Sequence, residues 1–159
     1  MQRGFATLEI IFATMIIVVL VTCTLPNVEH AVDRVALDYE TKRLYSEMRF
    51  LQAINRSGKF NVKGTGRNDL STTATDAPFM EIAPENCSYQ ILRGNTAIRE
   101  AHHMQNIKSI DTPKDTVTFD DTGQSNIVSD SIILTSRLGK QSKIIFDSVG
   151  RIRGGRDNE

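Results

Sequence analysis

The N-terminal segment RGFATLEIIFATMIIVVLVTCTLPN constrains the fold most, because a charged residue lies inside a long apolar run. From Phe5 to Leu25 every residue except Glu9 is apolar or small. A helix of about 20 such residues spans the ~30 Å hydrocarbon core of a bilayer. A carboxylate inside that span costs about 2–3.5 kcal/mol on insertion scales. The segment therefore predicts a membrane-spanning helix in which Glu9 needs a cationic partner.

Three simpler interpretations of this segment leave Glu9 unexplained or fit poorly. A cleaved secretory signal has a shorter apolar core and a small-x-small cleavage site, for which Thr22-Cys23-Thr24 is a poor substitute. A lipoprotein signal modified at Cys23 is disfavoured by the branched Thr22 before it. A plain single-pass anchor fits the length, and Arg3 would hold its N-terminus in the cytoplasm. We keep the plain anchor as the alternative.

After Pro26 the apolar residues become periodic, which predicts a second, amphipathic part of the same helix. No Gly or Pro occurs between Asn27 and Ser57, and Gly58 is a natural helix stop. The apolar positions recur mostly at three- and four-residue steps and are Val28, Val32, Val35, Leu37, Leu44, Met48, Leu51 and Ile54. We expect them to form one face that packs on a core. A coiled-coil partner is the alternative, although the repeat is short.

The rest of the chain, from Lys59 onward, is predicted to form strands and turns. KFNVKG (59–64) could be a short strand, and GTGRNDLSTTATDAP (64–78) reads as a long polar loop. Alternating or β-rich runs predict strands at CSYQILR (87–93), TVTF (116–119), SIILTS (131–136) and KIIF (143–146). Two of these runs end in the same pattern, F-D-x-x-G, at Phe119 and at Phe146, 27 residues apart. In each we expect a buried aromatic, an Asp that hydrogen-bonds the turn, and a Gly with positive φ.

The segment from Arg3 to Pro26 resembles the class III signal of type IV pilins and type II secretion pseudopilins. In that family a prepilin peptidase cuts after the glycine and N-methylates the next residue. The resemblance thus implies cleavage after Gly4, methylation of Phe5, and an assembly role for Glu9. Pro26 stands where many pilins have a helix-kinking proline. Physically, cleavage creates a cationic α-amine, and the amine of a neighbouring helix offset by one turn could satisfy Glu9.

The stretch LYSEMRFLQAINRS (44–57) and the arrangement vtFdxxG…iil…iiFdxxGRxR resemble the GspH/FimT group of pseudopilins and minor pilins. The implied fold is α+β: a long N-terminal helix packed by its second half on a small antiparallel β-domain. The expected parts are a leader (1–4), a transmembrane half-helix (5–25), an amphipathic half-helix (26–58) and an extracytoplasmic β-rich domain with a basic tail (59–159). No C-terminal disulfide like that of many major pilins is present, which weakly favours a minor pilin or pseudopilin.

No residue pattern points to an enzyme, a cofactor or a metal. Cys23 and Cys87 lie in different environments, so we expect no disulfide between them. His102 and His103 have no metal-ligand spacing around them, and we expect a solvated pair. Asp121-Thr122-Gly123 matches the triplet of aspartic proteases, but such catalysis needs two carboxylates. The repeated F-D-x-x-G pattern explains the triplet as a turn.

The C-terminal tail is basic although the whole chain has a formal net charge of zero. Between Arg137 and Arg156 there are six basic residues and one acidic residue, Asp147. Arg151, Arg153 and Arg156 are candidate phosphate contacts. Some FimT-like minor pilins serve DNA uptake, so the resemblance makes DNA a possible partner. The alternative is a solubilising tail.

The sequence therefore predicts a non-enzymatic subunit of a type IV pilus or type II secretion pseudopilus. Its expected partners are a prepilin peptidase, other subunits bound through the N-terminal helix, and inner-membrane assembly machinery. It would span the inner membrane once, with its C-terminal domain outside the cytoplasm, and then enter the filament. The alternative from another class is an anchored extracytoplasmic binding domain that does not polymerise.

Overall fold

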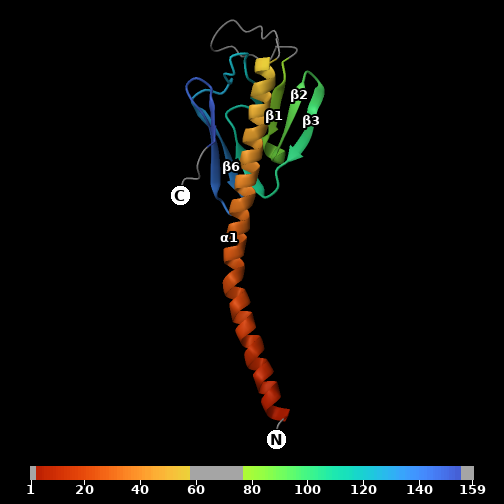
Figure 1. Cartoon of the computed structure of the whole chain (residues 1–159), viewed down its shortest axis with the longest axis vertical. Coiled ribbons are helices and arrows are strands. Elements are labelled where there is room, and N and C mark those ends of the chain that lie inside the picture. Colours follow the sequence, from red (N-terminus) through yellow and green to blue (C-terminus); the bar gives the residue numbers. More distant parts are fainter. Residues whose placement is uncertain (1–2, 58–76, 155–159) are drawn as a thin grey trace.

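One long helix and two small antiparallel sheets make up the described fold (Figure 1). The computed structural model describes residues 3–57 and 77–154. Helix α1 covers Arg3–Ser57, 55 residues, which corresponds to about 80 Å at 1.5 Å per residue. The helix continues through position 26, so Pro26 does not end it. A local kink at Pro26 stays a prediction, and Gly58 lies outside the described residues.

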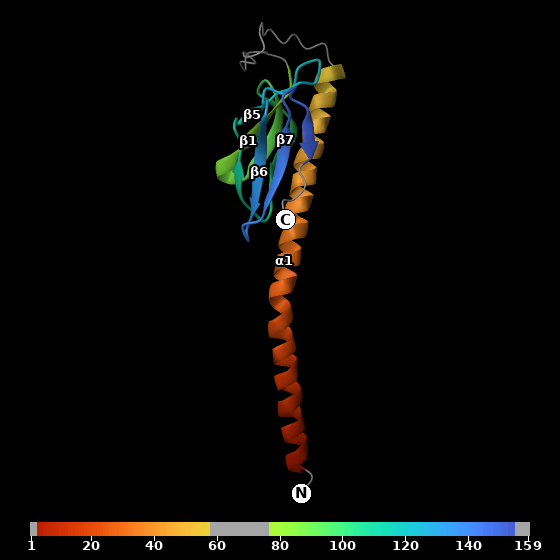
Figure 2. The ribbon, with the colours of Figure 1, turned by 90° about the vertical axis from the view of Figure 1, so that its left-hand side faces the viewer.

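The strands form two four-stranded sheets on the C-terminal half of α1. They are β1 (Phe79–Ala83), β2 (Ser88–Arg93), β3 (Thr96–His103), β4 (Ile107–Asp111), β5 (Thr116–Val117), β6 (Asp130–Ser136), β7 (Gln141–Phe146) and β8 (Ile152–Gly154), with a short 3₁₀ helix, η1 (Pro84–Asn86). The first sheet has the order β3-β2-β1-β5 and the second β4-β6-β7-β8, and all the pairs are antiparallel. In Figure 2 the sheets lie on one side of α1, and its opposite side is open.

The core forms where the inner faces of both sheets meet α1. Strand β7 shows the expected alternation: Ser142, Ile144 and Phe146 are buried, whereas Ile145 between them is exposed. The helix contributes Leu37, Leu44, Met48 and Leu51 to the same cluster. The α+β class and the packing of the second half of the helix on a small antiparallel β-domain are therefore confirmed.

The expected single apolar face of the helix was wrong for three of its residues. Leu37, Leu44, Met48 and Leu51 are buried, but Val28, Val32 and Val35 are 57–69% exposed. At about 100° per residue, the buried and the exposed residues lie on nearly opposite sides of the helix. Both groups of apolar residues recur mostly every three or four positions, so the sequence predicts a single face. That spacing alone does not show on which side of the helix each group lies.

The predicted strands that lie within the described residues are present, and four further strands were not predicted. Strands β2, β6 and β7 coincide with the predicted runs within a few residues, whereas the TVTF run contains only the two-residue β5. Strands β1, β3, β4 and β8 were not predicted. Strand β3 is exposed at nearly every position, so it carries no apolar alternation to read. The predicted strand at 59–64 and most of the polar loop lie outside the described residues.

Candidate assembly surface and basic edge

The N-terminal half of α1 carries the residues that the sequence analysis associated with processing and assembly. Gly4 and Phe5 lie in the first turns of the helix. Glu9 is exposed between Leu8 and Ile10, which are also exposed. No hydrogen bond or ion pair joins Glu9 to another described residue. Within Leu8–Ser57 an 18-residue window reaches a mean hydropathy of 2.5 with none of it buried, so this helix is long and apolar enough to cross a membrane.

A row of exposed apolar side chains continues beyond this apolar half. We call it the outer stripe; it consists of Leu25, Val28, Val32, Val35 and Tyr39, which are 56–69% exposed. The steps between them alternate between three and four residues, the spacing that keeps a stripe on one side of a supercoiled helix. The outer stripe faces away from the β-domain, because the domain covers the opposite side of α1.

Buried polar residues on α1 fix the β-domain to the helix, and the sequence analysis missed them. Gln52 donates from Nε2 to the carbonyl oxygen of Gly123 (2.6 Å). Asn55 donates from Nδ2 to the carbonyl oxygens of Pro78 and Phe119, both at 3.0 Å. Nearer the N-terminus, Asp33 Oδ2 accepts from Ser136 Oγ (2.6 Å). Asp33 precedes the buried Leu37 by four residues, and Gln52 and Asn55 follow the buried Met48 and Leu51 by four residues. This helical spacing was the signal available in the sequence.

Glu40 corrects the expectation of a solvated histidine pair. Its side chain is buried, its Oε2 lies 2.9 Å from His102 Nε2, and its Oε1 accepts from the backbone N–H of Gln105 (3.3 Å). His102 is half-buried on the side of β3 that faces the helix, whereas His103 is exposed. Successive side chains of a strand point to opposite faces, so one histidine of β3 faces the helix and its neighbour faces solvent.

The two F-D-x-x-G segments form matching turns, as predicted. Phe119 pairs with Ser125 and Phe146 with Ile152, so each turn closes over the same number of residues. In the first turn Asp120 Oδ1 accepts from the backbone N–H of Gln124 (2.7 Å).

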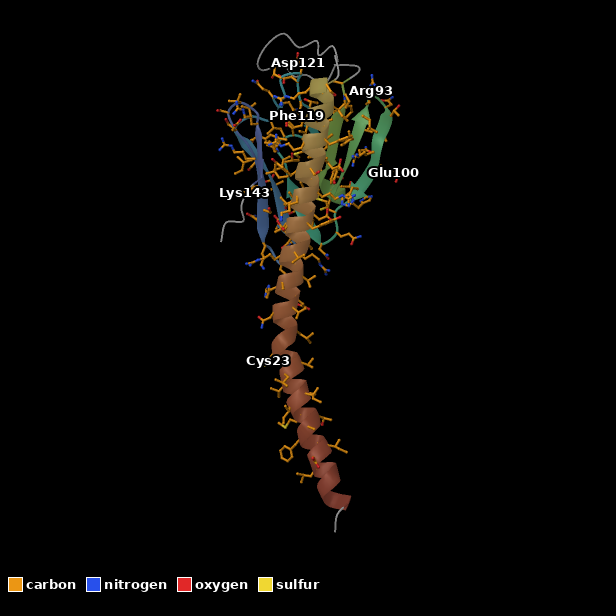
Figure 3. The ribbon with its side chains drawn as sticks, in the orientation of Figure 1. Cys23, Arg93, Glu100, Phe119, Asp121 and Lys143 are labelled. Carbon is orange, nitrogen blue, oxygen red and sulfur yellow. The ribbon has the colours of Figure 1, made fainter. Side chains whose placement is uncertain are left out.

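The second turn repeats these contacts. Asp147 Oδ1 accepts from the backbone N–H groups of Val149 (3.0 Å) and Arg151 (2.8 Å), and the bond from Arg151 is the main reason why the pKa of Asp147 is lowered. Gly123 and Gly150 have φ of 83° and 72°. Asp121 is exposed in the first turn, at the end of the domain far from the N-terminus (Figure 3).

The basic residues of the tail gather at one edge of the second sheet. Arg151, just before β8, and Arg153 on β8 are separated by the buried Ile152; both are exposed and therefore point to the same side. Arg153 pairs with Ile145 of β7 in the register, two residues from Lys143, which Figure 3 labels on this side of the domain. Arg153 Nη2 lies 4.0 Å from Asp147 Oδ2. Arg156 lies outside the described residues.

A polar pocket of about 300 Å³ lies between α1 and the first sheet. It is lined by Arg43, Glu47, Tyr89, Gln90, Ile91, Arg99, Glu100 and His102. Arg99 Nη1 contacts Glu47 Oε1 at 2.6 Å. Of the polar atoms that line this pocket, Glu47 Oε2 is buried without a hydrogen-bond partner among the described residues, and the Tyr89 hydroxyl lies beside Arg43. Burial raises the pKa of Tyr89 to about 12.

Both cysteines are free. Cys23 lies on the part of α1 that extends beyond the domain (Figure 3), and Cys87 is half-buried after η1. Comparisons of the chain with protein-family models, curated proteins and solved structures found no match.

Proposed function

We propose that this protein is a structural subunit of a type IV pilus or type II secretion pseudopilus, a minor pilin or pseudopilin without catalytic activity. A prepilin peptidase would cut it after Gly4 and methylate Phe5. The subunit would span the inner membrane through the N-terminal half of α1, with its β-domain outside the cytoplasm. Assembly machinery in that membrane would then move it into a filament, where its helix packs on the helices of other subunits.

One observation carries the proposal: a single helix holds an exposed apolar surface that begins around Glu9 and extends past the apolar half as the outer stripe. A membrane can cover the apolar half, but a stripe that reaches Tyr39, beside the β-domain, needs protein to cover it. Glu9 adds a requirement for a cation within the apolar layer. Neighbouring processed helices would supply both the apolar surface and the α-amine.

Cleavage after Gly4 is tested by mass spectrometry of the full-length protein expressed with and without a prepilin peptidase. We expect a mature chain that begins at methylated Phe5, and a Gly4→Leu variant that keeps Met1 to Gly4. A matched Ala6→Leu variant, two residues away, should still be cut. A mature chain that begins at Met1 in the presence of an active peptidase would contradict the proposal.

The role of Glu9 is tested separately from cleavage. In a Glu9→Leu variant we expect normal processing at Gly4 and a large loss of incorporation into filaments, because the carboxylate no longer selects the offset that brings a neighbouring amine to it. Thr14→Leu, in the same apolar half-helix, is the control for added bulk. Parental incorporation of the Glu9→Leu chain would show that the acid has no assembly role.

DNA binding for uptake is a second candidate function, favoured by the exposed pair Arg151 and Arg153, which flank the buried Ile152 at the start of β8. Two guanidinium groups on the same side of a strand can contact successive phosphates. Arg156 stays a predicted member of this group.

A membrane-anchored binding domain that does not polymerise is the candidate from another class. The polar pocket beside Glu47 and Tyr89 favours it, because an unpaired polar atom such as Glu47 Oε2 in a concave site can bind a small polar ligand. The two classes differ in filament incorporation: a binding domain would be retained in the membrane when a pilus or pseudopilus assembles.

A further inference from the structure

The turn between β6 and β7 is the part of the β-domain that lies nearest the N-terminal half of α1 (Figure 2). We call it the hairpin tip; it consists of residues 137–140. Two hydrogen bonds fix this turn to the helix. Ser136 Oγ, at its start, donates to Asp33 Oδ2 (2.6 Å), and Lys140 Nζ, at its end, donates to the carbonyl oxygen of His30 (3.2 Å). The hairpin tip is therefore held at a defined height along α1.

The side chains of the hairpin tip are open to a partner. Arg137 is exposed, and its guanidinium makes no hydrogen bond or ion pair with a described residue. Leu138 is 47% exposed, and a Cβ at Gly139 would meet nothing within 4 Å. The backbone of the turn is closed, because the N–H of Gly139 donates to the carbonyl oxygen of Ser136 (3.1 Å). A rigid turn thus presents an apolar side chain between two cationic ones.

The height of the hairpin tip matches the surface of a bilayer spanned by the apolar half of α1. His30, which Lys140 contacts, follows Leu25 at the end of the apolar run by five residues, or about 7.5 Å along the helix axis. The headgroup layer on each side of a bilayer is about 5–7 Å thick. Long basic side chains at this level can reach lipid phosphates. A tilt of about 20° toward the domain, usual for membrane helices, brings the hairpin tip closer still.

The charge at this level favours an anionic surface. Arg137 and Lys140 contribute two positive charges to the hairpin tip. The exposed acidic residue nearby on α1 is Glu29, one turn before Asp33, and neither cation forms an ion pair with it in the part of the chain that the structure describes. Each Lys or Arg close to an anionic membrane strengthens the attraction by about five-fold. Two such residues beside an exposed leucine suit the interface between lipid phosphates and acyl chains.

We propose that the hairpin tip binds the phosphate headgroups of the membrane in which α1 is anchored. Arg137 and Lys140 contact phosphates, and Leu138 enters the interfacial layer between them. The contact fixes how the β-domain is oriented above the membrane. The inference rests on the membrane-anchoring part of the proposed function, and it depends neither on cleavage after Gly4 nor on polymerisation.

Tryptophan fluorescence tests this contact, because the chain contains no tryptophan of its own. The full-length Leu138→Trp variant is reconstituted in vesicles of phosphatidylcholine with about one third phosphatidylglycerol, with and without lipid that carries a spin label on its headgroup. We expect the label to lower the fluorescence at least about two-fold. Val149→Trp is the matched control, because Val149 is exposed in the turn at the opposite end of β7. Its fluorescence should not change.

The role of charge is tested in the Leu138→Trp chain. Arg137→Gln should at least halve the quenching, roughly as expected for one lost charge near an anionic surface, and Arg137→Lys should retain it. Arg93→Gln removes the same charge at the end of the domain far from the N-terminus (Figure 3) and should have no effect. In vesicles of phosphatidylcholine alone, the quenching should be as weak as in the Arg137→Gln variant. Circular dichroism of each variant checks that the fold is intact.

Three results would overturn the proposal: equal quenching at positions 138 and 149, quenching at neither position, or quenching that is insensitive to Arg137→Gln. Flotation of the same vesicles at high salt measures anchoring independently. A chain that floats with the vesicles but gives one of these three results contradicts the lipid contact alone. A chain that does not float contradicts the contact and also the anchoring on which it rests, so the two failures are distinguishable.

Discussion

The backbone N–H of Ser125 donates to the carbonyl oxygen of Gly150 at 3.2 Å, so the two F-D-x-x-G turns are joined where each one ends. The contact is close because Gly150 has no side chain: a Cβ at this position would lie 2.6 Å from the backbone nitrogen of Ser125. At Gly123 a Cβ would meet the guanidinium of Arg56, also at 2.6 Å. Backbone cannot move aside, whereas the end of a long side chain can.

We therefore expect three glycine-to-alanine variants to differ in a fixed order. Gly150→Ala should lower the free energy of unfolding most, by roughly 2–4 kcal/mol, through both clash and positive φ. Gly123→Ala should cost less, because Arg56 can shift. Gly139→Ala is the control, since its φ is 85° but nothing lies within 4 Å of a Cβ; it should cost only about 1–2 kcal/mol of left-handed strain. Urea unfolding of the three variants gives the order, and a Gly139→Ala cost equal to that of Gly150→Ala would contradict it.

Asn55 should be essential for docking the end of α1 on the domain. Asn55→Ala leaves the carbonyl oxygens of Pro78 and Phe119 without their donor, which costs about 1–3 kcal/mol for each buried group left unsatisfied. Asn55→Asp keeps the shape but turns an oxygen toward those carbonyls, so it should cost more. Ser46→Ala, on the exposed part of the same helix, should change the stability by less than about 0.5 kcal/mol. Thermal unfolding is the measurement, and a neutral Asn55→Asp would refute this account.

Tyr89 should make the fold sensitive to alkali. A tyrosine in an unfolded chain ionises near pH 10, and burial raises the pKa of Tyr89 to about 12. The folded state therefore favours the neutral phenol, and this contribution to stability is complete below pH 10 and is lost as the pH rises toward 12. Tyr89→Phe should flatten the decline between pH 10 and 12, whereas Tyr39→Phe, at an exposed position, should leave it unchanged. The measurement is the urea concentration at the midpoint of unfolding, determined between pH 10 and 12 for the parent and for both variants.

If the protein binds DNA, Arg151 and Arg153 should account for part of the salt dependence. Replacing both with Gln should reduce the slope of log K against log salt by about 2, one unit for each lost phosphate contact. Lys108→Gln, on the strand at the opposite edge of the same sheet, should leave the slope unchanged. Fluorescence anisotropy with duplex DNA between 50 and 200 mM salt measures it. A parental protein without binding, or an unchanged slope in the Arg151→Gln, Arg153→Gln variant, would retire the DNA hypothesis.

The sequence alone determined the features that depend on neighbouring residues. The apolar half of the helix, its continuation to Ser57, strands such as β6 and β7, and the two turns closed by Gly123 and Gly150 were all predicted, because length, periodicity and turn chemistry are local properties. The roles of Gly4, Phe5 and Glu9 stay predictions, because they depend on a peptidase and on neighbouring chains.

Only the tertiary structure decided which side of α1 the domain covers. Leu37 and Val35 are two residues apart and equally apolar in pattern, yet one is buried and the other is exposed. Likewise, nothing local shows that Glu40 meets His102 or that Asn55 meets Phe119, because these partners are 62 and 64 residues apart in the chain. Burial is a property of the packed surfaces. The helix had to meet both sheets before one stripe became core and the other stayed exposed.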